Sequence, residues 1–197
     1  MMLNRNIVLL FIALAVHANA QEVSATKLQS SQKSIVSHYT KLAAKGKKVT
    51  HNPRAAGCVL DNQNGLVWEL KTDDDGVHDK DNTYRWGGRG AEQIGTLFFD
   101  DWNLLLDVTN KEKLCGFSDW RMPTIDELKT LVVAGSIPAI DRIFFHLTLP
   151  KPYWSASAYK NYPVHGQTVH FETGASYYYN GFRGDRLPLR LVRGYAN

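Results

Sequence analysis

The sequence predicts a mixed α+β domain. From Gly57 onward, short apolar stretches alternate with turn residues, and two stretches have the spacing or capping of helices. Two short apolar runs joined by an Asn-Gly turn predict a β-hairpin. Because composition changes at Gly57, we expect three parts along the chain, residues 1–20, 21–56 and 57–197.

The first 20 residues have the order of features that defines a secretory signal peptide. A polar, basic start is followed by an apolar run from Ile7 to Val16, and Ala18 and Ala20 supply the small residues that signal peptidase requires. The run has ten residues, whereas about twenty are needed to span a bilayer. We therefore expect a periplasmic, secreted or cell-surface protein without a membrane span.

Charge divides the remainder into a basic segment and a mildly acidic domain. Residues 21–56 hold seven Lys or Arg and one Glu, a net charge of +6, whereas residues 57–197 hold fifteen basic and eighteen acidic residues, a net charge of −3. The basic segment is either a solvated spacer or a means of holding the protein near anionic envelope molecules. Nothing in the acidic domain favours nucleic acid as a partner.

A helix is predicted in the basic segment. Leu28, Ile35 and Leu42 recur at seven-residue spacing in a stretch without glycine or proline, which indicates an amphipathic helix over residues 23–44 that ends at Gly46. The apolar stripe is too sparse for a regular coiled coil. A homo-oligomer formed through this helix is therefore one alternative among others.

The domain from Gly57 has further recognisable elements. Residues 58–60 and 66–68 flank the Asn-Gly turn of the hairpin, residues 92–107 place their apolar side chains on one helical face, and Thr124 with Glu127 forms a capping box for a short helix. Later segments are predicted strands, namely 153–158, 167–172, 176–179 and 188–192. In the last of them Leu189 and Leu191 alternate with Arg190, which predicts one buried face.

Two cysteines are present, Cys58 and Cys115. In an oxidising compartment an isolated pair most often forms a disulfide, which would tie the hairpin to the exit of the first predicted helix. The alternative is a reactive or metal-binding thiol pair, although neither cysteine lies in a CxxC sequence.

An acidic segment offers oxygen ligands to a cation. Its candidate ligands for Ca²⁺ are Asp73, Asp75, Asp79 and Asp81. Aligning Gly76 to an EF-hand puts Lys71 at the first ligand position, so the choice is between a different kind of calcium loop and a solvated acidic turn. The sequence has neither HExxH nor GxSxG, and we expect no other cofactor and no enzymatic activity.

A segment rich in aromatic residues near the C-terminus is the candidate ligand-binding region. Exposed aromatic rings beside planar polar side chains suit sugars, because C–H faces stack on the ring while hydroxyl groups bond the polar partners. The residues proposed for this role are Tyr178, Asn180, Phe182, Arg183, Asp185 and Arg186.

Several motifs in order resemble a known family. They are Gly-Leu-Val-Trp at 65–68, Cys-Gly-Phe-Ser-Asp-Trp-Arg-Met-Pro-Thr at 115–124, Tyr-Trp-Ser-Ala-Ser at 153–157 and Arg-Leu-Val-Arg-Gly at 190–194. The sequence is similar to the family named for the C-terminal domain of the Legionella collagen-like adhesin, related to C-type-lectin-like and formylglycine-generating-enzyme-like folds. This resemblance implies an α+β fold with two helices packed on small, twisted antiparallel sheets.

The resemblance also implies a function. It implies adhesion or ligand binding at the cell surface, the namesake binding sulfated glycans, although this chain has no collagen-like repeats and its domain is net acidic. The expected partner is a glycan or another envelope component. The alternatives are a structural partner of a pilus or secretion apparatus and a thiol- or metal-dependent enzyme on the related fold.

The charged motif before the capped helix has a structural interpretation. We expect Trp120 to be buried and Asp119 to bond Arg190 or Arg193. The residues given structural roles on these grounds are Asp119, Trp120, Arg121, Thr124, Glu127, Arg190 and Arg193.

Overall fold

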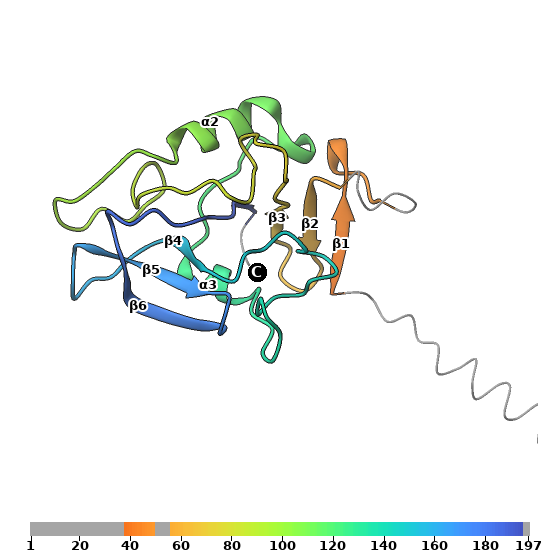
Figure 1. Ribbon diagram of the computed structural model, residues 1–197. Coiled ribbons are helices and arrows are strands. Elements are labelled where there is room, and N and C mark those ends of the chain that lie inside the picture. The colour runs from red at the N-terminus through yellow and green to blue at the C-terminus, as the bar shows by residue number, and fades with distance from the viewer. Residues whose placement is uncertain (1–37, 50–55, 195–197) are drawn as a thin grey trace, which may run out of the picture. The chain divides into compact units, whose positions relative to one another are not determined.

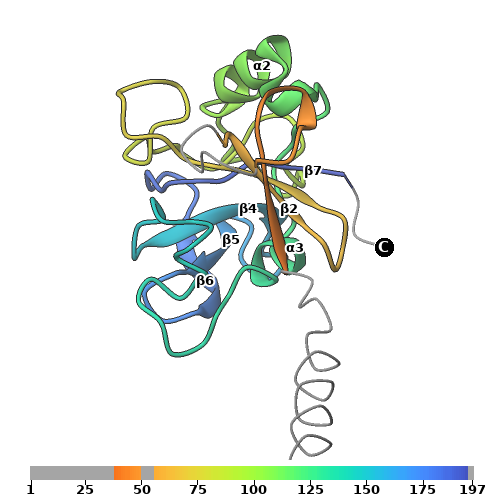
Figure 2. The same ribbon diagram turned by 90° about the vertical axis from the view of Figure 1, so that its right-hand side faces the viewer.

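The computed structural model of the chain describes residues 38–49 and 56–194. The predicted signal peptide and the predicted helix before His38 lie outside the described residues. The elements, shown in Figures 1 and 2, are β1 (Tyr39–Leu42), η1 (Ala44–Gly46), β2 (Cys58–Asp61), β3 (Val67–Glu69), α2 (Asn103–Glu112), η3 (Leu114–Gly116), α3 (Ile125–Lys129), β4 (Pro152–Ala158), β5 (His165–His170), β6 (Ala175–Phe182) and β7 (Val192–Arg193).

Within the described residues the strands form a four-stranded sheet with the order β1-β2-β3-β7 and a three-stranded sheet with the order β4-β5-β6. All neighbouring strands are antiparallel. The helix α2 lies on the opposite side of the domain from β5 and β6, whereas α3 lies beside β4 and β5 (Figure 1). The expected combination of two helices with small antiparallel sheets is therefore confirmed for the described residues.

The first strand corrects the helix prediction. Residues 39–42 are a strand paired with β2, Tyr39 opposite Asp61 and Leu42 opposite Cys58. Tyr39 and Leu42 are both buried, so pairing with the sheet provides burial and backbone hydrogen bonds together. The sparse apolar spacing that predicted a helix stabilises this segment less than its pairing with β2 does.

The hairpin of β2 and β3 is confirmed. Cys58 lies opposite Glu69 and Val59 opposite Trp68. The turn is fixed by Asp61, whose carboxylate accepts the Gln63 amide at 2.9 Å and the Asn64 side-chain amide at 2.8 Å. Gly65 has a φ of 76°, the positive value that its place in the turn favours.

The helix predicted over residues 92–107 begins late, because α2 starts only at Asn103. At Gly95 φ is 77°, and a Cβ atom there would lie 2.6 Å from the Cβ of Pro163. The chain around Gly95 therefore packs against the β4–β5 loop in a conformation that a helix does not allow. The buried face is nevertheless partly as expected, since Trp102, Leu105 and Leu106 are buried.

The capping box of α3 is confirmed. The Glu127 amide donates to the Thr124 hydroxyl at 3.2 Å, and the Thr124 amide donates to the Glu127 carboxylate at 2.9 Å. The same carboxylate pairs with the guanidinium of Arg121, at 2.6 and 2.8 Å. These contacts fix the start of α3 against the motif that precedes it.

The C-terminal strand is shorter than predicted. Only Val192 and Arg193 pair as β7, and Leu189, Arg190 and Leu191 are all fully buried, so the prediction of one buried face is wrong. Here the chain runs between the packed layers, where both of its sides are covered.

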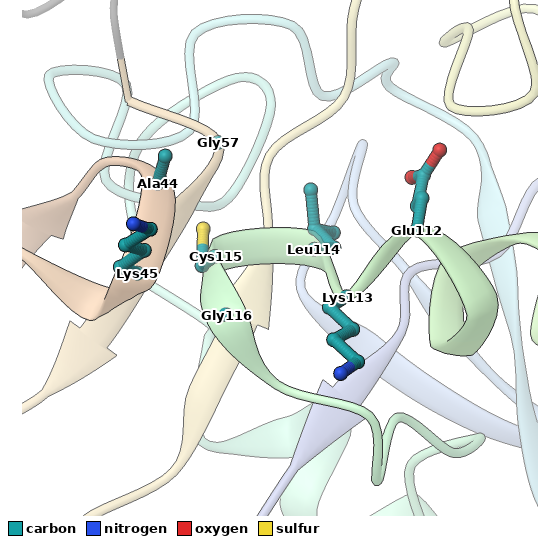
Figure 3. A pocket seen from close by; sticks show the side chains of 8 residues that line it. All are labelled: Ala44, Lys45, Gly57, Glu112, Lys113, Leu114, Cys115 and Gly116. Atoms are coloured by element: carbon teal, nitrogen blue, oxygen red, sulfur yellow. The ribbon is translucent and has the colours of Figure 1, made fainter.

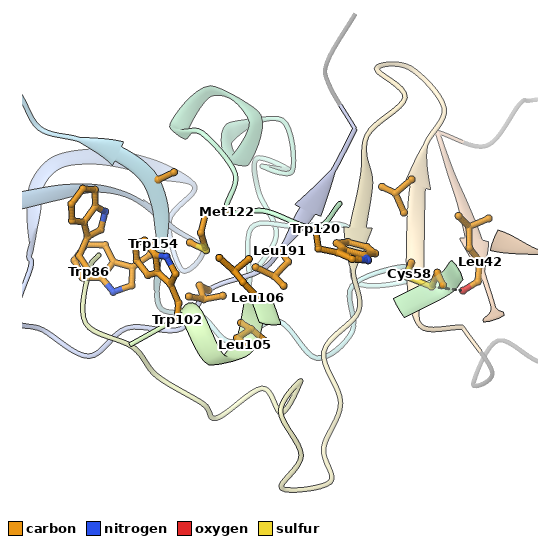
Figure 4. Packing of buried hydrophobic residues seen from close by; sticks show 14 of the residues in the cluster. Leu42, Cys58, Trp86, Trp102, Leu105, Leu106, Trp120, Met122, Trp154 and Leu191 are labelled. Atoms are coloured by element: carbon orange, nitrogen blue, oxygen red, sulfur yellow. Dashed lines mark hydrogen bonds between the residues drawn. A yellow bond between two sulfur atoms is a disulfide. The ribbon is translucent and has the colours of Figure 1, made fainter. Parts of the chain in front are cut away.

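Buried side chains of the described residues form two clusters. One joins the tryptophans 86, 102, 120 and 154 with α2 and the disulfide (Figure 4). The other joins α3 to Trp68, Tyr153 and Phe171. Adjacent residues of one strand divide between the clusters, as Tyr153 and Trp154 do. Both faces of β4 are thus covered.

Candidate functional site

A surface hollow of about 350 Å³ lies where the end of β4 meets the start of α3. Its side chains come from the chain before α2, from α3, β4, β5 and the β4–β5 loop, and they include acids, amides, a hydroxyl, an amine and an aromatic ring. The lining residues are Glu92, Ile125, Asp126, Ser157, Tyr159, Lys160, Asn161 and Gln167.

Hydrogen bonds fix the walls of this hollow. The Ile125 amide donates to the Ser157 hydroxyl at 3.1 Å, which ties the first turn of α3 to β4. The Ala158 amide donates to the Glu92 carboxylate at 3.2 Å, and the Gln167 side-chain amide donates to the Ala158 carbonyl at 2.9 Å. The hollow is therefore preformed rather than made by a free loop.

Some polar atoms of the hollow remain available. Among the described residues, no group donates a hydrogen bond to the side-chain oxygen of Asn161 or of Gln167. Asp126 contacts Lys129 through one carboxylate oxygen at 3.2 Å. Amide and carboxylate oxygens of this kind are acceptors for ligand hydroxyl groups.

Aromatic side chains continue from the hollow along the surface. The rings of Tyr159 and Tyr162 are stacked with centroids 5.6 Å apart and an interplanar angle of 24°. Tyr162 contacts the ring of His165 edge to face at 6.2 Å, and His165 contacts Phe182 in the same way at 6.2 Å. We call these four residues the aromatic row. Two of its members are exposed, Tyr162 by 58% and Phe182 by 45%.

The aromatic row and the hollow together have the composition that suits a polyhydroxylated ligand. A sugar ring presents C–H groups on its faces, which stack on aromatic rings, and hydroxyl groups around its edge, which bond planar amides and carboxylates. Sequence reasoning missed Tyr159, Asn161 and Tyr162. The available signal was a turn between two predicted strands that contains two tyrosines and an asparagine.

Of the residues predicted to bind ligand, Phe182 belongs to the aromatic row. Asp185 and Arg186 are exposed, and Arg186 contacts the Thr83 carbonyl at 3.1 Å and Asp101 at 3.4 Å. Tyr178 and Asn180 belong to β6, but their side chains lie outside the described part of the structure.

The prediction that Arg183 binds ligand is wrong, because its side chain is fully buried and has no surface for a ligand. Its guanidinium lies over the ring of Trp86 at 4.1 Å, and its Nη1 donates to the Leu97 carbonyl at 3.0 Å. Burial lowers the pKa of this group. Arg183 therefore supports the surface from beneath.

The acidic segment is organised by its own lysine and backbone. The Lys80 amine bonds Asp73 at 2.5 Å and Asp81 at 2.6 Å, and Asp79 accepts the backbone amides of residues 74, 75 and 81 at 2.8 to 3.1 Å. In the described ranges, no three His, Cys, Asp or Glu side chains gather as a metal site would require. These contacts provide Asp73, Asp79 and Asp81 with partners other than a metal ion.

The residues assigned structural roles lie in the interior or in ion pairs, except Thr124, which caps α3. The Arg193 guanidinium bonds Asp119 at 2.9 and 2.8 Å, which is one of the two partners expected, and Trp120 is buried. Arg190 instead donates to the Glu69 carbonyl and to the Thr148 hydroxyl at 2.8 Å.

The predicted disulfide is present between Cys58 and Cys115, and neither cysteine of the chain is free. It lies at the edge of another hollow, of about 550 Å³, in which η1 faces η3 (Figure 3). Lys45, Lys113 and Cys115, which line this hollow, all have a positive φ of 54° to 60°. Cys58 lies in β2 and Cys115 in η3, so the disulfide connects the hairpin to the segment after α2.

None of the helices in residues 38–49 and 56–194 has the length and apolar character needed to cross a bilayer.

The fold and the surface hollow describe a small, disulfide-linked α+β module. Its residues 57–193 match the Lcl C-terminal domain, so the chain belongs to that family. Membership of this family suggests a surface or adhesin-related module. No curated protein and no solved structure matches the chain.

Proposed function

We propose that this protein is an exported, non-enzymatic binding module that recognises carbohydrate of the cell envelope or cell surface through the hollow at Tyr159. The proposal rests on one observation. The aromatic row adjoins the side-chain oxygens of Asn161 and Gln167, which accept no hydrogen bond from the described residues. The signal-peptide sequence and the family of an adhesin domain support the same class of function.

The arrangement favours a neutral sugar over a polyanion. Asp126 and Glu92 line the hollow together with one basic residue, Lys160, so the local charge is not positive. Tyr162 and Phe182 extend the aromatic surface beyond the hollow, which suits a chain of several sugar units rather than one. Because the cysteines are joined to each other, the proposal involves no reactive thiol.

A glycan array with the intact secreted chain, with and without Ca²⁺, tests the proposal. We expect binding to neutral glycans, weakened about fivefold to tenfold by Tyr162→Ala and by Asn161→Ala, because each removes a stacking or bonding partner. Leu104→Ala is the matched control, since Leu104 is an exposed apolar side chain on α2, 69% accessible. Absence of glycan binding, or equal weakening by all three variants, would contradict the proposal.

A further inference from the structure

A separate hollow, of about 750 Å³, has an unusual excess of basic side chains. It is lined by Lys41, Ala56, Leu70, Lys71, Thr72, Asp73, His146 and Leu147. The basic residues come from β1, from the chain after β3 and from the loop before β4. Segments distant in sequence therefore bring positive charge to one place.

Lys71 is the buried basic group of this hollow. Its side chain is only 2% exposed, and its amine pairs with the carboxylate of Glu69 at 3.0 Å. The same carboxylate oxygen also pairs with the His78 imidazole at 2.7 Å. Glu69 is thus the counter-ion of Lys71, and it shares the His78 imidazole with Glu112, whose carboxylate bonds the other ring nitrogen.

Arg190 adds a positive charge behind the wall. It is fully buried, and its Nη2 bonds the hydroxyl of Thr148, the residue after Leu147 in the lining. Within the described residues no carboxylate forms an ion pair with Arg190, and its Nε has no hydrogen-bond partner. A buried guanidinium without a carboxylate partner is costly unless another anion lies near it.

The remaining charged groups do not cancel this excess. Lys41 has its amine 5.7 Å from the centre of the Phe144 ring and pairs with no carboxylate of the described residues. Asp73 is the acid of the lining, and the amine of Lys80 already bonds it at 2.5 Å. The hollow is therefore surrounded by more positive than negative charge.

His146 responds to this environment. Its pKa is lowered by partial burial and further by the positive charges of Lys41 and Arg190. A neutral imidazole at neutral pH remains able to donate one hydrogen bond and to gain a proton when an anion approaches.

We infer that this hollow binds an oxyanion group, a carboxylate, sulfate or phosphate, that bonds Lys41, Lys71 and His146. The group would provide negative charge for Lys41 and Arg190, which form no ion pair with a carboxylate of the described residues. This site differs from the hollow at Tyr159 in both position and chemistry, so it adds an anionic ligand to the proposed sugar-binding function without depending on it.

Titration of the intact chain with sodium sulfate, phosphate, acetate or glucuronate, at constant ionic strength with chloride, tests the inference by NMR of His146. We expect saturable binding of at least one anion and a rise in the pKa of His146. Tighter binding of glucuronate than of acetate would assign the carboxylate to a sugar, and equal binding would assign it to a small free anion.

The variant Lys41→Gln should weaken binding about tenfold, because it removes a charged hydrogen-bond donor. Lys111→Gln removes the same charge from the exposed surface of α2 and should leave the affinity unchanged. Two results would overturn the inference: a response no greater than that to chloride, or equal weakening in both variants. Neither result depends on whether the protein binds neutral glycans.

Discussion

The buried carboxylate of Glu69 pairs with the imidazole of His78, the Oε1 and Nδ1 atoms lying 2.7 Å apart. The other imidazole nitrogen of His78 reaches Glu112 on α2 at 2.5 Å. The second oxygen of Glu69 accepts the Leu191 amide at 2.8 Å. One carboxylate thus joins β3, the loop that contains His78 and the chain leading into β7, and its protonation state affects all of them.

This network predicts a stability maximum in mildly acidic solution. Burial raises the pKa of Glu69, but Lys71, His78 and the Leu191 amide outweigh it and lower the pKa from 4.5 to about 2. Its contribution to stability is present above the unfolded value and is lost as pH falls toward about 2. Burial lowers the pKa of His78, but Glu69 and Glu112 raise it above 6.5, so its contribution is present below 6.5 and is lost as pH rises through the raised value.

Urea unfolding at about pH 5.5 and about pH 9 of the natural chain and of His78→Gln measures this effect. The natural chain should be more stable than the variant at the lower pH, and the difference should shrink at the higher pH. A difference that grows with pH would have the wrong sign for a histidine stabilised by carboxylates.

Removing the carboxylate of Glu69 should strongly destabilise the fold. Glu69→Gln leaves the buried amine of Lys71 without its counter-ion and should lower the free energy of unfolding by about 3 to 5 kcal/mol. Glu112→Gln is the matched control, because Glu112 is 42% exposed and its pair with His78 should be worth less than about 1 kcal/mol. Equal losses in equilibrium unfolding would show that Glu69 is not the centre of the network.

Removing the disulfide should cause a large loss of stability. Cys58 and Cys115 are 57 residues apart, and closing a loop of that length restricts the unfolded chain by about 4 kcal/mol in the chain-entropy account. The double variant Cys58→Ala with Cys115→Ala should lose about this much stability in urea. Reducing the natural chain should give a similar loss, and a reduced chain as stable as the oxidised one would refute the assignment.

Sequence patterns were sufficient to predict the structures that are formed by residues close together in the chain. Thr124 and Glu127 are three residues apart and predicted their own capping box, and the hairpin turn before Gly65 followed from the residues that form it. The pairing of Cys58 with Cys115 was also predictable, since the chain has no other cysteine.

Non-local packing accounts for what the sequence did not predict. Leu42 is compatible with a helix, and only its pairing with Cys58 makes it part of a strand. Arg183 follows a run of aromatic residues that indicated an exposed loop, yet it fits beneath that surface over Trp86. Tyr159 gains its place in the hollow from α3, which precedes it by some thirty residues.

Because Arg183 is buried, its substitution should affect stability rather than ligand binding alone. Arg183→Ala removes the side chain that covers Trp86 and should cost about 2 to 4 kcal/mol. Arg183→Met keeps much of the volume without the guanidinium, whose Nε and Nη2 have no partners in the described residues, and should cost about 1 kcal/mol or less. Thermal and urea unfolding distinguish the two, and Arg186→Ala provides an exposed control.

A pair of glycines opposite each other in the three-stranded sheet is required for the packing of two tryptophans. Gly166 of β5 lies opposite Gly181 of β6. A Cβ at Gly166 would lie 2.3 Å from Cδ1 of Trp86, and one at Gly181 would lie 2.2 Å from Cζ3 of Trp154. Both indoles are held in place, since Trp86 donates to the Ser155 carbonyl at 2.9 Å and Trp154 donates to the Tyr84 carbonyl at 2.7 Å.

Each substitution, Gly166→Ala or Gly181→Ala, should therefore destabilise the fold by about 1 to 3 kcal/mol through overpacking, measured by urea unfolding. Gly184→Ala is the control for stability, because its Cβ would meet only the ring of Phe182, which is 45% exposed. Gly166 follows His165 of the aromatic row, and Arg183 lies over Trp86. Displacing Trp86 should consequently disturb the aromatic row, so Gly166→Ala should weaken glycan binding as well as stability, whereas Gly184→Ala should leave stability unchanged.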